Sequence, residues 1–255
     1  MTTTPGNANT TVPAAPPIVD LATWQAARDE LLIKEKAHTR EGDAIAAARR
    51  RLPMVEVPPD TTVVGPDGPV PFGDVFEGRD ELVVYSHMFY EGKPWEWQCE
   101  GCTRNTWNMG DAADAAYLNA NGITFAVLGK GPYEELAAFR DFMGYTVPWY
   151  SNAHLDHPTV SHEGHIACYL RRDGKIYLTY STTGRGDEVI QPAFGLLDMT
   201  VYGRRESFED SPDGWLQFPT HAFLRTDEHG APKGPRNGGR PVPEWTRPGA
   251  TPVDT

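Results

Sequence analysis

Two apolar segments rich in β-branched and aromatic residues, ELVVYSHMFY (81–90) and ITFAVLGK (123–130), constrain the fold of this chain most strongly. Short apolar runs of this kind predict buried strands. The residues between them have a helical pattern that ends at Gly122, and PYEELAAFRDFMG (132–144) predicts a further helix with Pro132 at its start. The sequence therefore predicts a strand–helix–strand–helix unit.

Two hairpins complete the predicted core. The segment HIACYLRRDGKIYLTYST (165–182) predicts two alternating strands, and VVGPDGPVPFGDVF (63–76) predicts a hairpin that turns at Asp67-Gly68. A short helix is expected over 193–203. A βαβ unit followed by a hairpin and a helix is the thioredoxin arrangement. We therefore expect an α/β, thioredoxin-like fold with a central mixed sheet.

The two ends of the chain differ from this core, because its 23 prolines and 25 glycines crowd towards them. Residues 1–19 are predicted to form a disordered leader. Residues 20–53 are expected to form an N-terminal helical extension, capped by Asp20 and interrupted at Gly42-Asp43. The thioredoxin-like domain is expected over 54–206, and a Pro/Gly-rich, extended C-terminal tail over 207–255.

The charge of the chain excludes several classes of partner. There are 35 acidic and 23 basic residues, a net charge of −12, whereas proteins that bind nucleic acid or anionic membranes need a basic surface. No run of 18 apolar residues predicts a membrane span. The first 20 residues lack the pattern of a signal peptide, so a cytoplasmic location is expected. The sequence leaves the oligomeric state open.

The stretch CEGC places Cys99 and Cys102 directly after the first central strand and at the start of the following helix. A helix N-terminus stabilises a thiolate, so Cys99 is expected to attack a disulfide and Cys102 to resolve the mixed disulfide. The carboxylate of Glu100 opposes thiolate formation. The third cysteine, Cys168, alternates with apolar residues on a predicted strand and is expected to be a buried small side chain.

Four stretches carry a resemblance to a known family: LLIKEKAHTREGDAIAAARRRLPMVEV, VFEGRDELVVYSHMF, FRDFMGYTVPWYSN and YSTTGRGDEVI…GLLDMTVYGRRE. Over about residues 20–206 the chain resembles the thioredoxin-like bacterial family catalogued as domain of unknown function number 899, which is described as predicted dithiol–disulfide oxidoreductases. The resemblance implies a thioredoxin-type fold with Cys99 and Cys102 as the functional pair. It implies no particular substrate.

A metal site is the main alternative. Half of the eight histidines fall in the segment HLDHPTVSHEGH: His154, His157, His162 and His165. His165 stands where thioredoxins carry a cis-proline opposite the cysteine pair. Two thiolates and the His165 imidazole would suit copper, or zinc with a fourth ligand, and His162 or His87 could replace His165. This set resembles that of the thioredoxin-fold copper chaperones of cytochrome oxidase assembly, whose cysteines are spaced CxxxC.

A third alternative is a non-catalytic module that binds a ligand in an aromatic cleft, lined by Trp95, Trp97, Trp107 and Tyr180. Arg185 is expected to pair with Asp187 or Glu188. The leading prediction is a thiol–disulfide oxidoreductase that acts on a small-molecule or protein thiol or disulfide and needs no cofactor. The alternative is a copper-binding protein or copper-dependent oxidase, with zinc as the less favoured metal. The sequence does not decide between them.

Overall fold

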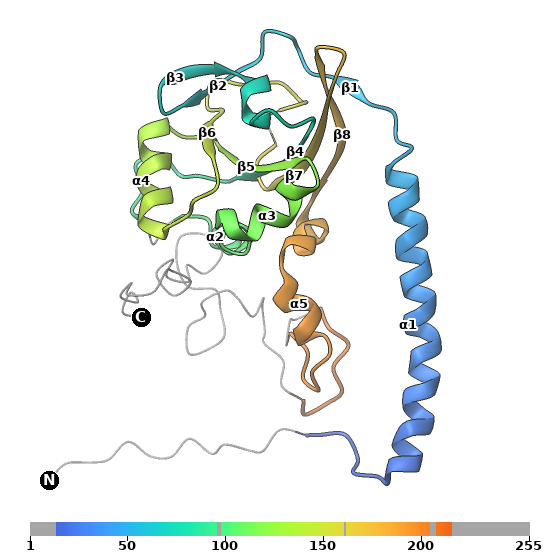
Figure 1. Ribbon diagram of the computed structural model, residues 1–255. Coiled ribbons are helices and arrows are strands. Elements are labelled where there is room, and N and C mark those ends of the chain that lie inside the picture. Colours follow the sequence, from blue (N-terminus) through green and yellow to red (C-terminus); the bar gives the residue numbers. More distant parts are fainter. Residues whose placement is uncertain (1–13, 96–97, 161, 205–207, 216–255) are drawn as a thin grey trace, which may run out of the picture.

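The computed structural model describes residues 14–95, 98–160, 162–204 and 208–215. Their strands form one mixed, eight-stranded sheet in the order β1-β8-β7-β4-β5-β6-β2-β3 (Figure 1). The strands are β1 (Val55–Glu56), β2 (Thr62–Gly65), β3 (Gly68–Pro71), β4 (Glu81–His87), β5 (Ile123–Gly129), β6 (Trp149–Ser151), β7 (His165–Arg172) and β8 (Lys175–Thr183). The helices are α1 (Leu21–Arg49), α2 (Glu100–Trp107), α3 (Ala112–Ala120), α4 (Tyr133–Met143) and α5 (Pro192–Leu197), with the 3-10 helices η1 (Phe72–Phe76) and η3 (Gly184–Ile190).

The centre of the sheet is the predicted thioredoxin-like unit. Strands β4, β5 and β6 are parallel, and their connections contain α2, α3 and α4. Strand β7 then pairs antiparallel with β4, and β8 pairs antiparallel with β7. This topology confirms the predicted α/β, thioredoxin-like fold with a mixed sheet. The β7–β8 hairpin turns at Asp173 and Gly174, both with positive φ, which suits a tight two-residue turn.

Apolar side chains cover both faces of the sheet, which explains the continuous apolar runs of β4 and β5. On one face, side chains of β4 and β5 pack against α2, α3 and α4. Figure 1 shows these three helices next to the sheet. On the other face, Leu82, Val84 and Leu128 pack with η1 and the segment around Val160. The edge hairpin of β2 and β3 confirms the predicted hairpin, but its turn is at Pro66-Asp67, one residue earlier than predicted, because Gly68 already pairs with Gly65 as the first residue of β3.

Helix α1 differs from the prediction because it is continuous through Gly42 and Asp43. The Asp20 carboxylate accepts a hydrogen bond from the Thr23 N–H at 2.7 Å and begins the helix as expected. A glycine inside an exposed helix lowers helix stability by only about 1 kcal/mol relative to alanine. The surrounding alanines, lysines and glutamates favour the helix strongly enough to offset this loss. None of its residues is buried, and Figure 1 shows α1 running alongside the rest of the structure.

The helical segment between β4 and β5 is two helices, α2 and α3, separated around Gly110. A side chain at Gly110 would collide with the ring of Tyr145. The Gly110 carbonyl accepts hydrogen bonds from the Thr146 and Val147 N–H groups, at 2.8 and 3.1 Å, instead of continuing a helix. Asp111 then caps α3. Helix α5 is also shorter than the predicted 193–203.

Candidate functional site

The two thiols of the CEGC stretch lie at the carboxyl end of β4. Cys99 is the N-cap of α2, and its Sγ accepts a hydrogen bond from the Cys102 N–H at 3.5 Å. The Sγ of Cys102 accepts one from the Met88 N–H, just past β4, at 3.3 Å. Each cysteine is only 4% exposed. The end of the strand and the first turn of the helix therefore fix both sulfurs in a buried position.

The surroundings shift the pKa values of the two thiols in opposite directions. The pKa of Cys99 is lowered to about 7, first because the Cys102 thiol donates a hydrogen bond to the Cys99 thiolate, with further help from backbone N–H groups and the Tyr90 side chain. The pKa of Cys102 is raised well above its usual range by the same hydrogen bond, by burial and by the Cys99 charge. Cys99 is therefore the thiol that ionises first, near neutral pH, while Cys102 keeps its proton.

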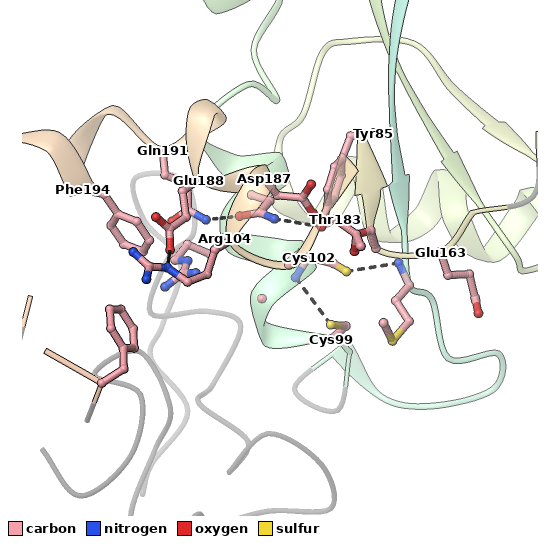
Figure 2. Close-up of a pocket in the computed structure, with 17 residues that line it drawn as sticks. Tyr85, Cys99, Cys102, Arg104, Glu163, Thr183, Asp187, Glu188, Gln191 and Phe194 are labelled. Carbon is pink, nitrogen blue, oxygen red and sulfur yellow. Dashed lines mark hydrogen bonds and ion pairs between the residues drawn. The ribbon is translucent and has the colours of Figure 1, made fainter. Parts of the chain in front are cut away.

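Both thiols face a cavity of about 450 Å³ (Figure 2). Its walls come from α2, the end of β4, the turn before β7, η3 and α5. A cavity of this size admits a small molecule. Phe194 and Phe208 also line this cavity, with the guanidinium groups of Arg104 and Arg185 over their rings at 4.7 and 4.3 Å. Figure 2 shows Phe194 at the side away from the thiols.

A chain of buried side chains connects Cys102 to the residue after η3, as the dashed lines of Figure 2 show in part. The Tyr85 hydroxyl hydrogen-bonds to the Cys102 sulfur and lowers the pKa of that thiol, against the larger effects that raise it. The Asn105 side-chain N–H donates to the Tyr85 hydroxyl at 3.0 Å. The Gln191 side-chain N–H donates in turn to the Asn105 carbonyl. These contacts fix the hydroxyl beside the resolving thiol.

Asp187, on η3, is the carboxylate that lines the cavity while itself buried, at 4% exposure. Burial raises its pKa to about 6, and the neighbouring His165 and the Ile166 N–H oppose this only in part. Its Oδ1 has no hydrogen-bond partner within the described residues. Asp187 thus lines the same cavity as the two thiols and titrates closer to neutral pH than an exposed aspartate. Arg185 pairs with Glu188 at 3.0 Å, one of the two predicted partners, which leaves Asp187 available.

Sequence reasoning missed the catalytic potential of Asp187 and the roles of Tyr85 and Asn105. The segment TTGRGDE gave one usable signal, an acidic residue in a glycine-rich connection next to the predicted hairpin. Nothing local in the sequence indicates that this connection folds over the thiols. Only the pairing of β7 with β4 brings it there.

The histidines proposed as ligands lie apart from the thiols. His165 opens β7 as expected, but its Nδ1 hydrogen-bonds with the Glu163 carbonyl at 2.8 Å, and it is not among the described residues that line the cavity. The His162 ring lies 5.3 Å from the His165 ring. His87 packs between Phe139 and Trp149 in the core, where burial lowers its pKa to about 3.

The residues present do not fit the predicted metal site. Within the described parts of the chain, no three His, Cys, Asp or Glu side chains converge as metal ligands. Cys99, Cys102 and His165 therefore do not form the expected set, and neither His162 nor His87 replaces His165. A thiolate pair alone falls short of the three or four protein ligands that zinc sites use.

The predicted aromatic cleft is not assembled at the thiols either. Trp95 stacks on Phe142 of α4, with ring centroids 6.0 Å apart. Trp107 ends α2 and is 47% exposed. Tyr180 lines a different cavity, and Trp97 lies outside the described residues. Tyr85 of β4 lines the thiol cavity together with Phe194 and Phe208, and these two phenylalanines come from the part of the chain where sequence patterns are weakest.

Comparison with known protein families shows to which family the chain belongs. A family described as "Bacterial protein of unknown function (DUF899)" matches residues 13–226, which include the thiol pair, η3 and α5. The chain belongs to the DUF899 family. This confirms the family resemblance seen in the sequence. No curated protein sequence matches this DUF899 chain.

Solved structures share a similar arrangement at low identity. A structure assigned to the thiol:disulfide interchange protein DsbE of Chlorobium tepidum is 16% identical, with a TM-score of 0.37, over 55% of this DUF899 chain and 94% of its own. Peroxiredoxin Q of Xanthomonas campestris is 12% identical, with a TM-score of 0.38 and the same coverage. BsSco, a member of the Sco family of cytochrome c oxidase assembly proteins, is 14% identical, with a TM-score of 0.33, over 58% of this chain and 97% of its own. Similarity at this level assigns no activity.

Among the described helices, none is both long and apolar enough to cross a membrane.

Proposed function

We propose that this protein is a dithiol–disulfide oxidoreductase in which Cys99 is the nucleophile and Cys102 the resolving thiol. The opposed pKa shifts of two thiols on one turn of α2 carry the proposal, because they divide the roles of attack and resolution. The helix N-terminus at Cys99 supports the same division.

The reaction needs no cofactor. The Cys99 thiolate attacks one sulfur of a substrate disulfide, so that a Cys99–substrate disulfide forms and the other half leaves as a thiolate. Cys102 then loses its proton and attacks the Cys99 sulfur, which releases the second substrate thiolate and leaves a Cys99–Cys102 disulfide. Two electrons pass from the dithiol to the substrate, and the reverse sequence oxidises a substrate dithiol. We assign the acceptance of the Cys102 proton to the Asp187 carboxylate, which faces the same cavity.

We infer that the substrate is a small molecule. Each cysteine is 4% exposed, and the cavity of about 450 Å³ gives room for a disulfide of small-molecule size. A disulfide within a folded protein would have to reach the same buried sulfurs. Reduction of glutathione disulfide should therefore be much faster than reduction of the insulin disulfides. Equal rates would contradict the small-molecule inference and leave the dithiol role intact.

Trapping the mixed disulfide tests the division of roles. The reduced Cys102→Ser variant, mixed with glutathione disulfide, should accumulate one glutathione adduct at Cys99, measured by intact mass and peptide mapping. Cys99→Ser should form no adduct at Cys102 on the same timescale. Cys168→Ser, which removes the cysteine outside the cavity, should behave as the wild type. A Cys99→Ser variant that reacts as fast as the wild type would overturn the proposal.

A further inference from the structure

A second cavity, of about 630 Å³, lies on the same face of the sheet as the thiols and on the other side of η3. Side chains from four neighbouring strands line it: Val83, Phe125, Ile166, Cys168 and Tyr180. Cys168 and Tyr180 are paired across β7 and β8, so their side chains lie next to each other on one face. The strands' share of the lining is apolar apart from the Cys168 thiol and the hydroxyls of Tyr180 and Thr182.

Among the described residues, no helix covers this part of the sheet, and the cavity lies there. Helix α3 borders it on one side through Leu118, and η3 borders it on the other through Ile190. Helix α5, which follows η3, has only six residues and buries none of them. Two apolar side chains at the rim are exposed as a result, Tyr117 at 81% and Val189 at 78%. An apolar hollow with an exposed apolar rim is typical of a ligand site.

The positively charged side chain of Arg49 lies at the edge of this second cavity. The Arg49 guanidinium, at the end of α1, lies 5.0 Å from the centroid of the Tyr180 ring. Its positive charge acts on Cys168, where it lowers the thiol pKa against the larger effect of burial. In the described parts of the chain, no carboxylate forms an ion pair with Arg49. The other charged residue in the lining, Asp114, is on α3.

We propose that this cavity binds an amphipathic monoanion, with an aromatic or alkyl body over the strands and its acidic group at Arg49. The body removes the apolar lining from water, and the acid neutralises the guanidinium. Asp114 excludes a second acidic group from the α3 side. The site is spatially separate from the dithiol, since neither reacting sulfur lines it.

A matched pair of dyes tests both parts of the proposal. The probe 8-anilinonaphthalene-1-sulfonate has an aromatic body and one sulfonate, and N-phenyl-1-naphthylamine is its uncharged analogue. Both dyes should bind the full-length protein with one-to-one stoichiometry in fluorescence titrations. Arg49→Gln should weaken the sulfonate dye about tenfold and leave the uncharged dye unchanged, as expected for the loss of one charge-assisted contact. Arg50→Gln, at the next residue and outside the lining, should change neither by more than about twofold.

Filling the cavity is the second test. Cys168→Phe should abolish the binding of both dyes, whereas Cys168→Ser should retain it, in variants whose far-ultraviolet circular dichroism matches the wild type. Equal effects of Arg49→Gln and Arg50→Gln would overturn the role of Arg49. Undiminished dye binding by a folded Cys168→Phe variant would overturn the site itself. Failure of both dyes to bind, with a dimer that Cys168→Phe dissociates in sedimentation, would instead assign the cavity to a second copy of the chain.

Discussion

The Asn105 side chain donates a hydrogen bond to the Tyr85 hydroxyl at 3.0 Å, and both residues are buried. This contact leaves the Tyr85 proton free to face the Cys102 sulfur, which the hydroxyl stabilises as a thiolate. Burial raises the pKa of Tyr85 well above its usual range, so the hydroxyl remains a donor throughout the pH range of the reaction. Asn105 therefore acts on the resolving thiol through Tyr85.

Replacement of that hydroxyl should slow the resolving step more than the attack. In Tyr85→Phe, the Cys102 thiolate loses a donor, so its pKa should rise further and the conversion of the Cys99 mixed disulfide to the Cys99–Cys102 disulfide should slow by about tenfold. Stopped-flow measurement of the two product thiols separates the steps. Tyr169→Phe is the matched control, because that buried hydroxyl donates to the Thr159 carbonyl on the other face of the sheet. Equal slowing in both variants would contradict the assignment.

Asp187→Asn should stabilise the fold at neutral pH and impair resolution. The pKa of Asp187 is raised from 3.8 to about 6, so the folded protein loses stability as the pH rises from about 4 through 6 and the buried carboxyl ionises. The asparagine variant avoids this loss. Its melting temperature should exceed that of the wild type by a few degrees at pH 7.5 and match it at pH 4.

The same Asp187→Asn variant should lose the dependence of the resolving rate on a group with a pKa near 6. Glu163→Gln changes an exposed carboxylate of the same cavity and should keep both the wild-type melting temperature and the wild-type pH profile. A retained inflection near pH 6 in Asp187→Asn would show that another group accepts the proton.

His87→Phe should protect the protein from acid. The pKa of His87 falls to about 3 in the folded core, whereas an exposed histidine has a value near 6.5, so wild-type stability declines as the pH falls below about 6.5. At pH 5 this linkage amounts to about 2 kcal/mol, which the variant should recover relative to its own stability at pH 8. Urea unfolding at the two pH values measures it. The exposed His38→Phe is the control and should show no such difference.

The protein as purified should carry well below one metal ion per chain. Within the described residues the thiols have no third ligand in place, so the set of three or four protein ligands that zinc sites use is not preformed, and we expect no tightly held metal. Mass spectrometry of the metal content should give the same low value for the wild type, for the Cys99→Ser, Cys102→Ser double variant and for His165→Ala. Stoichiometric copper that is lost in both the double variant and His165→Ala would establish the alternative instead.

Local patterns in the sequence predict the parts of the structure that depend on local physics. They predict the apolar runs of β4 and β5, the Pro132 start of α4 and the two strands of the hairpin over 165–182, since each depends on neighbouring residues alone. The position of Cys99 at a helix N-terminus followed from the same patterns.

The parts that were missed depend on contacts between distant segments. Asn105 and Gln191 are 86 residues apart, and only the folded sheet brings them together. His165 was placed in the correct strand, but the turn before it presents Glu163 and Gly164 to the thiols, while the imidazole lies near Asp187. The break at Gly110 follows from its packing against Tyr145, which no local pattern indicates.

The 3-10 helix η3 separates the thiol cavity from the apolar cavity. Arg185, Asp187 and Glu188 face the dithiol, and Gly186, Val189 and Ile190 face the apolar hollow. Because this seven-residue helix lines both cavities, a shift of η3 towards one cavity moves it away from the other. A ligand that displaces η3 from the apolar side therefore also moves the wall of the thiol cavity formed by Arg185, Asp187 and Glu188. If that movement changes the equilibrium between dithiol and disulfide, thermodynamic reciprocity requires the oxidation state to change affinity on the apolar side by the same factor.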